Sequence, residues 1–62
     1  TAVAPLLRRL SDRDGEVRRQ AALSLGYLGD AQALDRLRAV ARDDRHEGVR
    51  EAAAVAASLL SR

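Results

Sequence analysis

Pairs of acidic side chains are the residues of this 62-residue chain whose types and spacing best suit catalysis. Asp12 with Asp14, and Asp43 with Asp44, could supply the acid and the base of a hydrolase, because such enzymes hold two carboxyl groups close together. Each pair lies in a polar stretch bracketed by arginine, with no apparent apolar pocket to shift a carboxyl pKa. We therefore interpret these acids as helix caps and ion-pair partners, and we predict no catalytic residue.

Other reactive groups are scarce. The chain has no cysteine and one histidine, and its serines lie in no nucleophile motif: Ser11, Ser24, Ser58 and Ser61. No glycine loop suits a phosphate group, and no apolar run reaches the roughly 18 residues that a membrane span needs. We expect a segment that is not an enzyme and that has no cofactor, metal or membrane partner. The cytoplasm is the default location.

The charged residues alternate in sign. Eleven arginines and nine acids give a net charge of +2, spread evenly along the chain. A protein that binds nucleic acid usually gathers its basic residues on one face with few acids between them. The alternation instead indicates a solvated, salt-bridged surface and argues against a nucleic-acid partner.

Apolar residues spaced by three and four predict four helices. The first covers about Ala2 to Leu10 and the third about Ala31 to Ala41. The second begins after a cap at Asp14, and Gly29 can end it. The fourth opens at Glu47 or Val49 after a polar loop. In the second helix four residues are predicted to share one apolar face: Val17, Ala21, Leu25 and Leu28.

The pattern of the first helix pair recurs in the second. Val3 maps onto Leu34 at a separation of 31 residues, while Val17 and Leu28 map onto Val49 and Leu60 at 32. A helical hairpin that repeats at this interval is typical of an α-solenoid, in which neighbouring units bury each other's apolar faces. We predict an all-α fold of two hairpins, with repeat 1 at about residues 1–29 and repeat 2 at about residues 30–62.

Residues 17–30, VRRQAALSLGYLGD, resemble the HEAT repeats, and more narrowly the short HEAT-like repeats of phycobilisome lyase subunits. That pattern has a polar turn, Val-Arg, an alanine-rich helix and a closing Leu-Gly-x-Leu-Gly-Asp. The resemblance covers essentially the whole chain and implies an α-solenoid, whereas it constrains function weakly. The second copy departs from it at its end, where Ser58, Ser61 and Arg62 replace the glycines and the aspartate. We expect the chain to be a fragment of a longer repeat protein.

The resemblance also implies roles for several charged residues. Arg18 and Arg50 occupy the repeated Val-Arg position, where related families bridge arginine to acids of neighbouring turns. We predict a structural ion-pair ladder, and a ligand-binding role for the two arginines is the less favoured alternative. The candidate acids of the ladder are Asp12, Asp14, Asp43 and Asp44. His46-Glu47 suggests the His-Glu pairs with which the HEAT-like deoxyhypusine hydroxylases bind iron. It lies earlier than those pairs, in a loop, and we predict a solvated loop histidine or part of the start of the fourth helix.

A second candidate site lies on the opposite face of the second helix. Its residues, with those 32 positions later, form what we call the ridge: Arg19, Leu23 and Tyr27, then Glu51, Val55 and Leu59. Two parallel apolar rows flanked by opposite charges suit a partner helix or peptide. The alternative is packing against a neighbouring repeat or flanking segment, and this is favoured for Leu23, Val55 and Leu59. Tyr27 is the best single candidate for binding.

We therefore predict a non-catalytic scaffold that binds a protein partner through the ridge and packs against adjacent repeats of its parent chain. Two alternatives stay open. The segment could belong to a bilin lyase-like enzyme whose repeats hold a tetrapyrrole, or to a DNA-binding HEAT-like protein of the alkylation-repair type. The second would require arginines clustered on one face and binding that weakens steeply with salt.

Overall fold

The computed structural model describes residues 3–62, and within them all regular structure is helical. Helix α1 spans Val3–Arg9, α2 spans Gly15–Leu28, α3 spans Leu34–Asp43 and α4 spans Glu47–Leu60, with a short 3-10 turn, η1, at Ala31–Ala33. The predicted all-α fold with four helices in two hairpins is confirmed. Ala2, which the first predicted helix included, lies outside the described residues.

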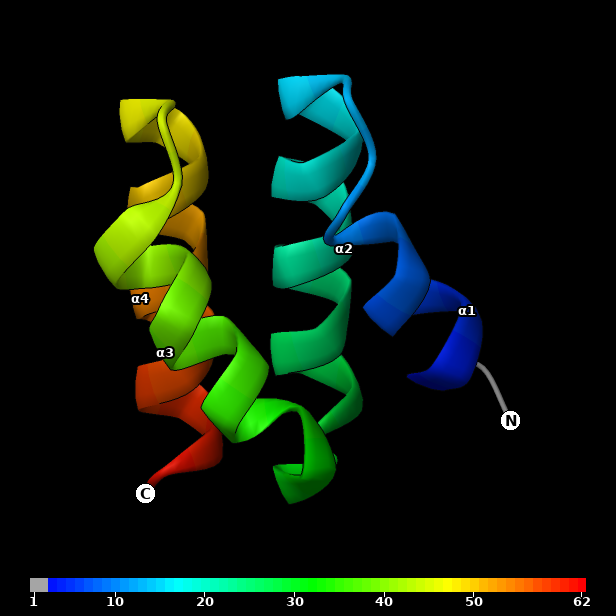
Figure 1. Ribbon diagram of the computed structural model, residues 1–62. Coiled ribbons are helices and arrows are strands. Elements are labelled where there is room, and N and C mark those ends of the chain that lie inside the picture. Colours follow the sequence, from blue (N-terminus) through cyan, green and yellow to red (C-terminus); the bar gives the residue numbers. More distant parts are fainter. Residues whose placement is uncertain (1–2) are drawn as a thin grey trace.

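The helices form two hairpins that stand side by side. Helix α1 packs on α2, α3 packs on α4, and α2 packs directly on α4. Figure 1 shows α2 and α4 running in the same direction. Helix α1 lies on the side of α2 that faces away from α4, and α3 crosses in front of α4. The second helices therefore form the junction between the hairpins.

The helix ends follow local chemistry. The Asp14 carboxylate accepts a hydrogen bond from the Glu16 N–H and caps α2. At the other end Gly29 has φ of 74° and donates its N–H to the Leu25 carbonyl, a left-handed conformation that glycine adopts without a steric penalty. Both predicted caps are confirmed. Asp30 then caps η1, so the third predicted helix begins as a 3-10 turn.

The core is made of alanine, leucine and valine. Leu25 and Leu37 are its largest fully buried side chains, and most of its other members are alanines. Small side chains let α2 and α4 approach closely while keeping high helix propensity. The prediction that Leu28 shares the buried face is wrong, because this last residue of α2 is 51% exposed.

Candidate functional site

A buried ion pair joins the two hairpins. Arg18, in the first turn of α2, is only 4% exposed. Its Nε lies 2.8 Å from Asp44 Oδ2, and its Nη2 lies 3.2 Å from Asp44 Oδ1. Its Nη1 donates to the Asp12 carbonyl at 2.7 Å. One guanidinium thus ties the turn of its own hairpin to the turn of the next.

Both members of this pair are held in their charged forms. Hydrogen bonds from Arg18 lower the pKa of the Asp44 carboxyl below its usual range, against the opposing effect of burial. The Arg18 pKa is correspondingly raised by its hydrogen bonds to Asp44. On the surface of α2, hydrogen bonds from Arg19 and Gln20 lower the pKa of Glu16 to about 2.

These lowered pKa values predict acid sensitivity. Below about pH 4 the unfolded chain binds more protons than the folded chain at Asp44 and Glu16, so the free energy of unfolding should fall as the pH decreases toward 2. Above about pH 5 both carboxyls are ionised in both states and contribute no slope. The Asp44→Asn variant should be less stable at pH 7 but lose less stability on acidification. Thermal unfolding followed by circular dichroism between pH 7 and pH 2 tests this, and parallel curves for the two proteins would contradict it.

The remaining predicted ladder acids lie in different surroundings. Asp12 Oδ1 accepts the Asp14 N–H at 2.8 Å, and Asp14 caps α2. Asp43 lies 3.3 Å from the neighbouring Arg42 on the surface. Arg50 donates Nη1 to the Asp44 carbonyl at 2.7 Å. The structure thus brings Arg18, Arg50 and Asp44 together and leaves Asp43 outside the group.

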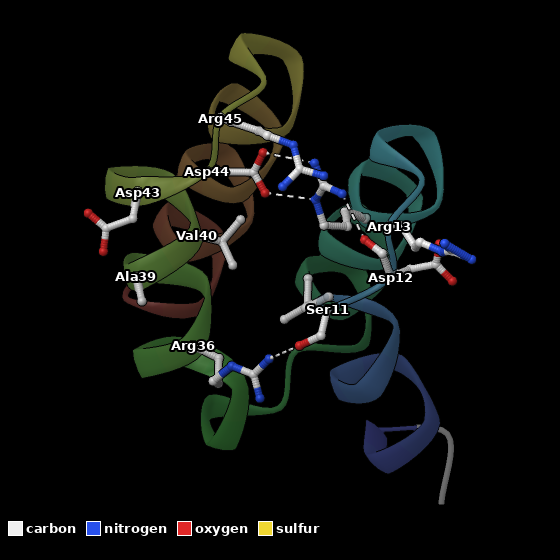
Figure 2. Close-up of a pocket in the computed structure, with 11 residues that line it drawn as sticks. Ser11, Asp12, Arg13, Arg36, Ala39, Val40, Asp43, Asp44 and Arg45 are labelled. Atoms are coloured by element: carbon white, nitrogen blue, oxygen red, sulfur yellow. Dashed lines mark hydrogen bonds and ion pairs between the residues drawn. The ribbon is translucent and has the colours of Figure 1, made fainter.

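A charged groove opens next to the buried ion pair, between the turn after α1 and the side of α3 that faces this turn. Its volume is about 590 Å³. Figure 2 shows Asp12 and Arg13 on one wall and Asp44 and Arg45 on the other, with Arg36 at the lower end. Arg36 Nη2 donates to Ser11 Oγ at 3.2 Å and crosses the groove. This bridge between α3 and the first turn was not predicted, since the sequence does not indicate which residues face each other across the groove.

The groove offers little for acid–base catalysis. A general acid at neutral pH needs a raised carboxyl pKa, whereas the two carboxyl groups with a clear shift, Asp44 and Glu16, have lowered ones. Of the groove's acids, Asp44 is paired with Arg18, and Asp12 is hydrogen-bonded to a backbone N–H. The arrangement therefore favours holding the two turns together.

His46 lies at the start of α4, where its ring faces α2. Its backbone N–H donates to Asp44 Oδ1 at 2.9 Å. A Cβ placed on Gly15 would lie 2.9 Å from His46 Cδ2, so the ring lies close to the first residue of α2. Among residues 3–62, no three histidine or acidic side chains converge as metal ligands would.

The ridge residues differ in exposure. Tyr27 is 82% exposed, Val55 is 54% exposed and Glu51 is also exposed. Leu23 is partly buried against the core, and Leu59 Cδ1 would lie 3.4 Å from a Cβ on Gly26. The partly buried Arg19 donates Nη2 to Glu16 Oε2 at 2.7 Å. The most exposed apolar groups of the ridge are thus Tyr27 on α2 and Val55 on α4.

Stacked helical hairpins with a repeated arginine define this chain as a solenoid-type protein. More particularly, a family model described as HEAT repeats matches residues 1–58, so the chain belongs to the HEAT repeat family. No curated protein and no solved structure matches the chain. The match does not distinguish the phycobilisome lyase type, which stays a prediction. None of the helices described for residues 3–62 has the length and hydropathy needed to cross a bilayer.

Proposed function

We propose that the chain is a non-catalytic scaffold that binds a protein partner through the ridge on α2 and α4. HEAT repeats generally mediate protein interactions and are generally non-catalytic. The observation that carries the choice of surface is the 82% exposure of Tyr27, since a large apolar side chain left in water is a common anchor for a partner.

The surroundings of Tyr27 support this surface. Val55, at 54% exposure, adds a second apolar contact on the neighbouring helix. Leu23 and Leu59 are half-buried, so they would form a floor between the two exposed groups. Glu51 and the Arg19–Glu16 ion pair add polar groups along the two helices. An apolar centre with a charged rim is the usual composition of a protein interface.

A comparison of two double variants tests the proposal. Immobilised wild-type chain, Tyr27→Glu/Val55→Glu and Ala4→Glu/Gln32→Glu are used to capture proteins from a lysate of the source organism. The control pair adds the same charges at exposed positions on α1 and η1. We expect the ridge variant to lose its specific partners by roughly tenfold or more, because anchor residues contribute most of the binding energy.

The control variant should retain the same partners, and circular dichroism should show unchanged helicity in all three proteins. Equal recovery by the ridge variant and the wild type would contradict the proposal. If the double variant loses helicity, Val55→Glu alone decides the result, because that side chain is more than half exposed.

A further inference from the structure

The two hairpins hold their arginines in the same way. Arg18 Nη1 donates to the carbonyl of Asp12, six residues earlier, at 2.7 Å. Arg50 Nη1 donates to the carbonyl of Asp44, also six residues earlier, at 2.7 Å. Each guanidinium is therefore fixed against the turn that precedes its own helix.

The aspartates of the two turns are also held alike. Asp12 Oδ1 accepts the Asp14 N–H at 2.8 Å, and Asp44 Oδ1 accepts the His46 N–H at 2.9 Å. The remaining oxygen of Asp44, Oδ2, receives Arg18 Nε. Asp12 and Asp44 thus make the same contact to the backbone N–H two residues later, through Oδ1 in each case.

Of these arginines and aspartates, only one pair is joined by an ion pair, which we call the closed junction. Arg18 of the first hairpin reaches Asp44 of the second. Among residues 3–62, Arg50 donates only its Nη1, and the Asp12 carboxylate accepts only at Oδ1, so Arg50 Nε and Nη2 and Asp12 Oδ2 have no hydrogen-bond partner there. One end of the hairpin pair thus presents a cation and the other presents an anion, each positioned as in the closed junction.

The helix surfaces at the two ends repeat the inner interface. On α2, Ala22 and Gly26 are buried, and Gly26 lies against α4. The equivalent residues 32 positions later, Ala54 and Ser58 on α4, are also small but are exposed. The far side of α4 therefore presents a surface like the one that α2 uses to receive α4.

The other end of the hairpin pair, at α2, carries a surface equivalent to the one that α4 uses to contact α2. On α4, Ala56 and Leu59 face Gly26 of α2. Their equivalents on α2 are the half-buried Ser24 and the exposed Tyr27. The side of α2 that faces away from α4 thus carries the equivalents of the α4 residues that contact α2.

We propose that a second copy of this chain stacks head-to-tail on the first, with α4 of one copy against α2 of the next. In this arrangement Arg50 of one copy pairs with Asp12 of the next, as Arg18 pairs with Asp44 within the chain. Tyr27 of the next copy lies over Ser58, as Leu59 lies over Gly26. This goes beyond the proposed function, because it concerns the two end surfaces of the hairpin pair. The two surfaces share Tyr27, so within a stack only the copy whose α2 is uncovered keeps Tyr27 open to a different partner.

Charge complementarity supports a second copy as the occupant. The unpaired arginine and the unpaired aspartate lie at opposite ends of one chain, so each chain carries both halves of the contact. The rotation and translation that carry the first hairpin onto the second, applied again to the second hairpin, would place the first hairpin of the next copy. Such a head-to-tail contact is not closed by two-fold symmetry, and assemblies should therefore grow beyond dimers as concentration rises.

Sedimentation equilibrium of the 62-residue chain from 10 μM to 1 mM tests the proposal with charge-reversed variants. The wild-type average mass should rise with concentration. Arg50→Asp and Asp12→Arg, each alone, should associate at least roughly tenfold more weakly, because each brings like charges together. An equimolar mixture should recover association, since every junction in an alternating stack then pairs opposite charges.

Two further comparisons make the result specific. Asp35→Arg makes the same charge change at an exposed position of α3 and should associate like the wild type. Arg50→Asp keeps both Tyr27 and Val55 and should capture the same partners as the wild type, so a failure of the partner-capture experiment and a failure of stacking are distinguishable. If circular dichroism shows that a reversed variant is unfolded, Arg50→Gln and Asp12→Asn replace the pair and should each weaken association. A wild-type chain that stays monomeric at 1 mM overturns the proposal. Association that is insensitive to the substitutions at Arg50 and Asp12 does so too.

Discussion

Replacement of Asp44 by alanine should lower the midpoint of thermal unfolding by at least about 10 °C. The reason is the charge that remains. Arg18 is 4% exposed, and two of its three hydrogen-bonded nitrogens donate to the Asp44 carboxylate. Without that carboxylate the buried guanidinium loses its hydrogen-bonded counter-ion and keeps only the bond to the Asp12 carbonyl. The substitution also removes the acceptor for the His46 N–H at the start of α4.

The neighbouring residue gives a matched control. Asp43→Ala removes a carboxylate that lies 3.3 Å from Arg42 on the surface, where both side chains are largely exposed. Exposed ion pairs contribute little, so the midpoint should change by less than about 4 °C. Thermal unfolding at pH 7, followed by circular dichroism at 222 nm, measures both. Equal losses for the two variants would show that Arg18 does not depend on its buried partner.

Replacement of both charges separates the ion pair from the space it fills. The double variant Arg18→Met/Asp44→Leu leaves no buried charge behind. It should be more stable than Asp44→Ala, because apolar groups of similar size often replace a buried ion pair without large loss. Both variants lack the acceptor for the His46 N–H, so a double variant that is less stable than Asp44→Ala would assign the further loss to the hydrogen bond from Arg18 to the Asp12 carbonyl.

The sequence predicted the helices because their signals are local. Apolar spacing, the Asp14 cap and the left-handed Gly29 each act within one or two turns of chain, and the structure contains all of them. Repetition of the same signals at 31 to 32 residues was sufficient to identify the hairpins. The 3-10 start of the third helix was missed, because Asp30 caps a single tight turn before α3 begins.

Contacts between the hairpins could not be predicted in the same way. Four acids were candidate partners for the repeated arginines, and the structure places Asp44, 26 residues away, against Arg18. That choice depends on how the second hairpin sits on the first, which no local pattern encodes. Leu28 illustrates the same limit. Its spacing assigns it to an apolar face, but its side chain is about half exposed, whereas the equivalent Leu60 packs on the core.

Gly26→Ala should destabilise the chain by about 1–3 kcal/mol, even though alanine is the better helix former by about 1 kcal/mol. A Cβ on Gly26 would lie 2.9 Å from both Cα and Cβ of Ala56, and 3.4 Å from Leu59 Cδ1. The first of these atoms belongs to the backbone of α4, so no rotamer change relieves the overlap. The two helices must move apart at the junction where the hairpins meet.

The control for this substitution is Gly48→Ala in the first turn of α4. A Cβ there would find only Arg19 Cδ at 3.9 Å, an ordinary contact, so the gain in helix propensity should raise stability by about 0.4–1 kcal/mol. The same chemical change should thus have opposite signs at two positions, and urea unfolding followed by circular dichroism measures both. In Gly26→Ala/Ala56→Gly the clash with Cβ is gone but the clash with Cα stays, so only part of the loss should be recovered. Stabilisation by Gly26→Ala alone would mean that α2 and α4 are not in close backbone contact, and the stacked arrangement of the hairpins would then be wrong at its centre.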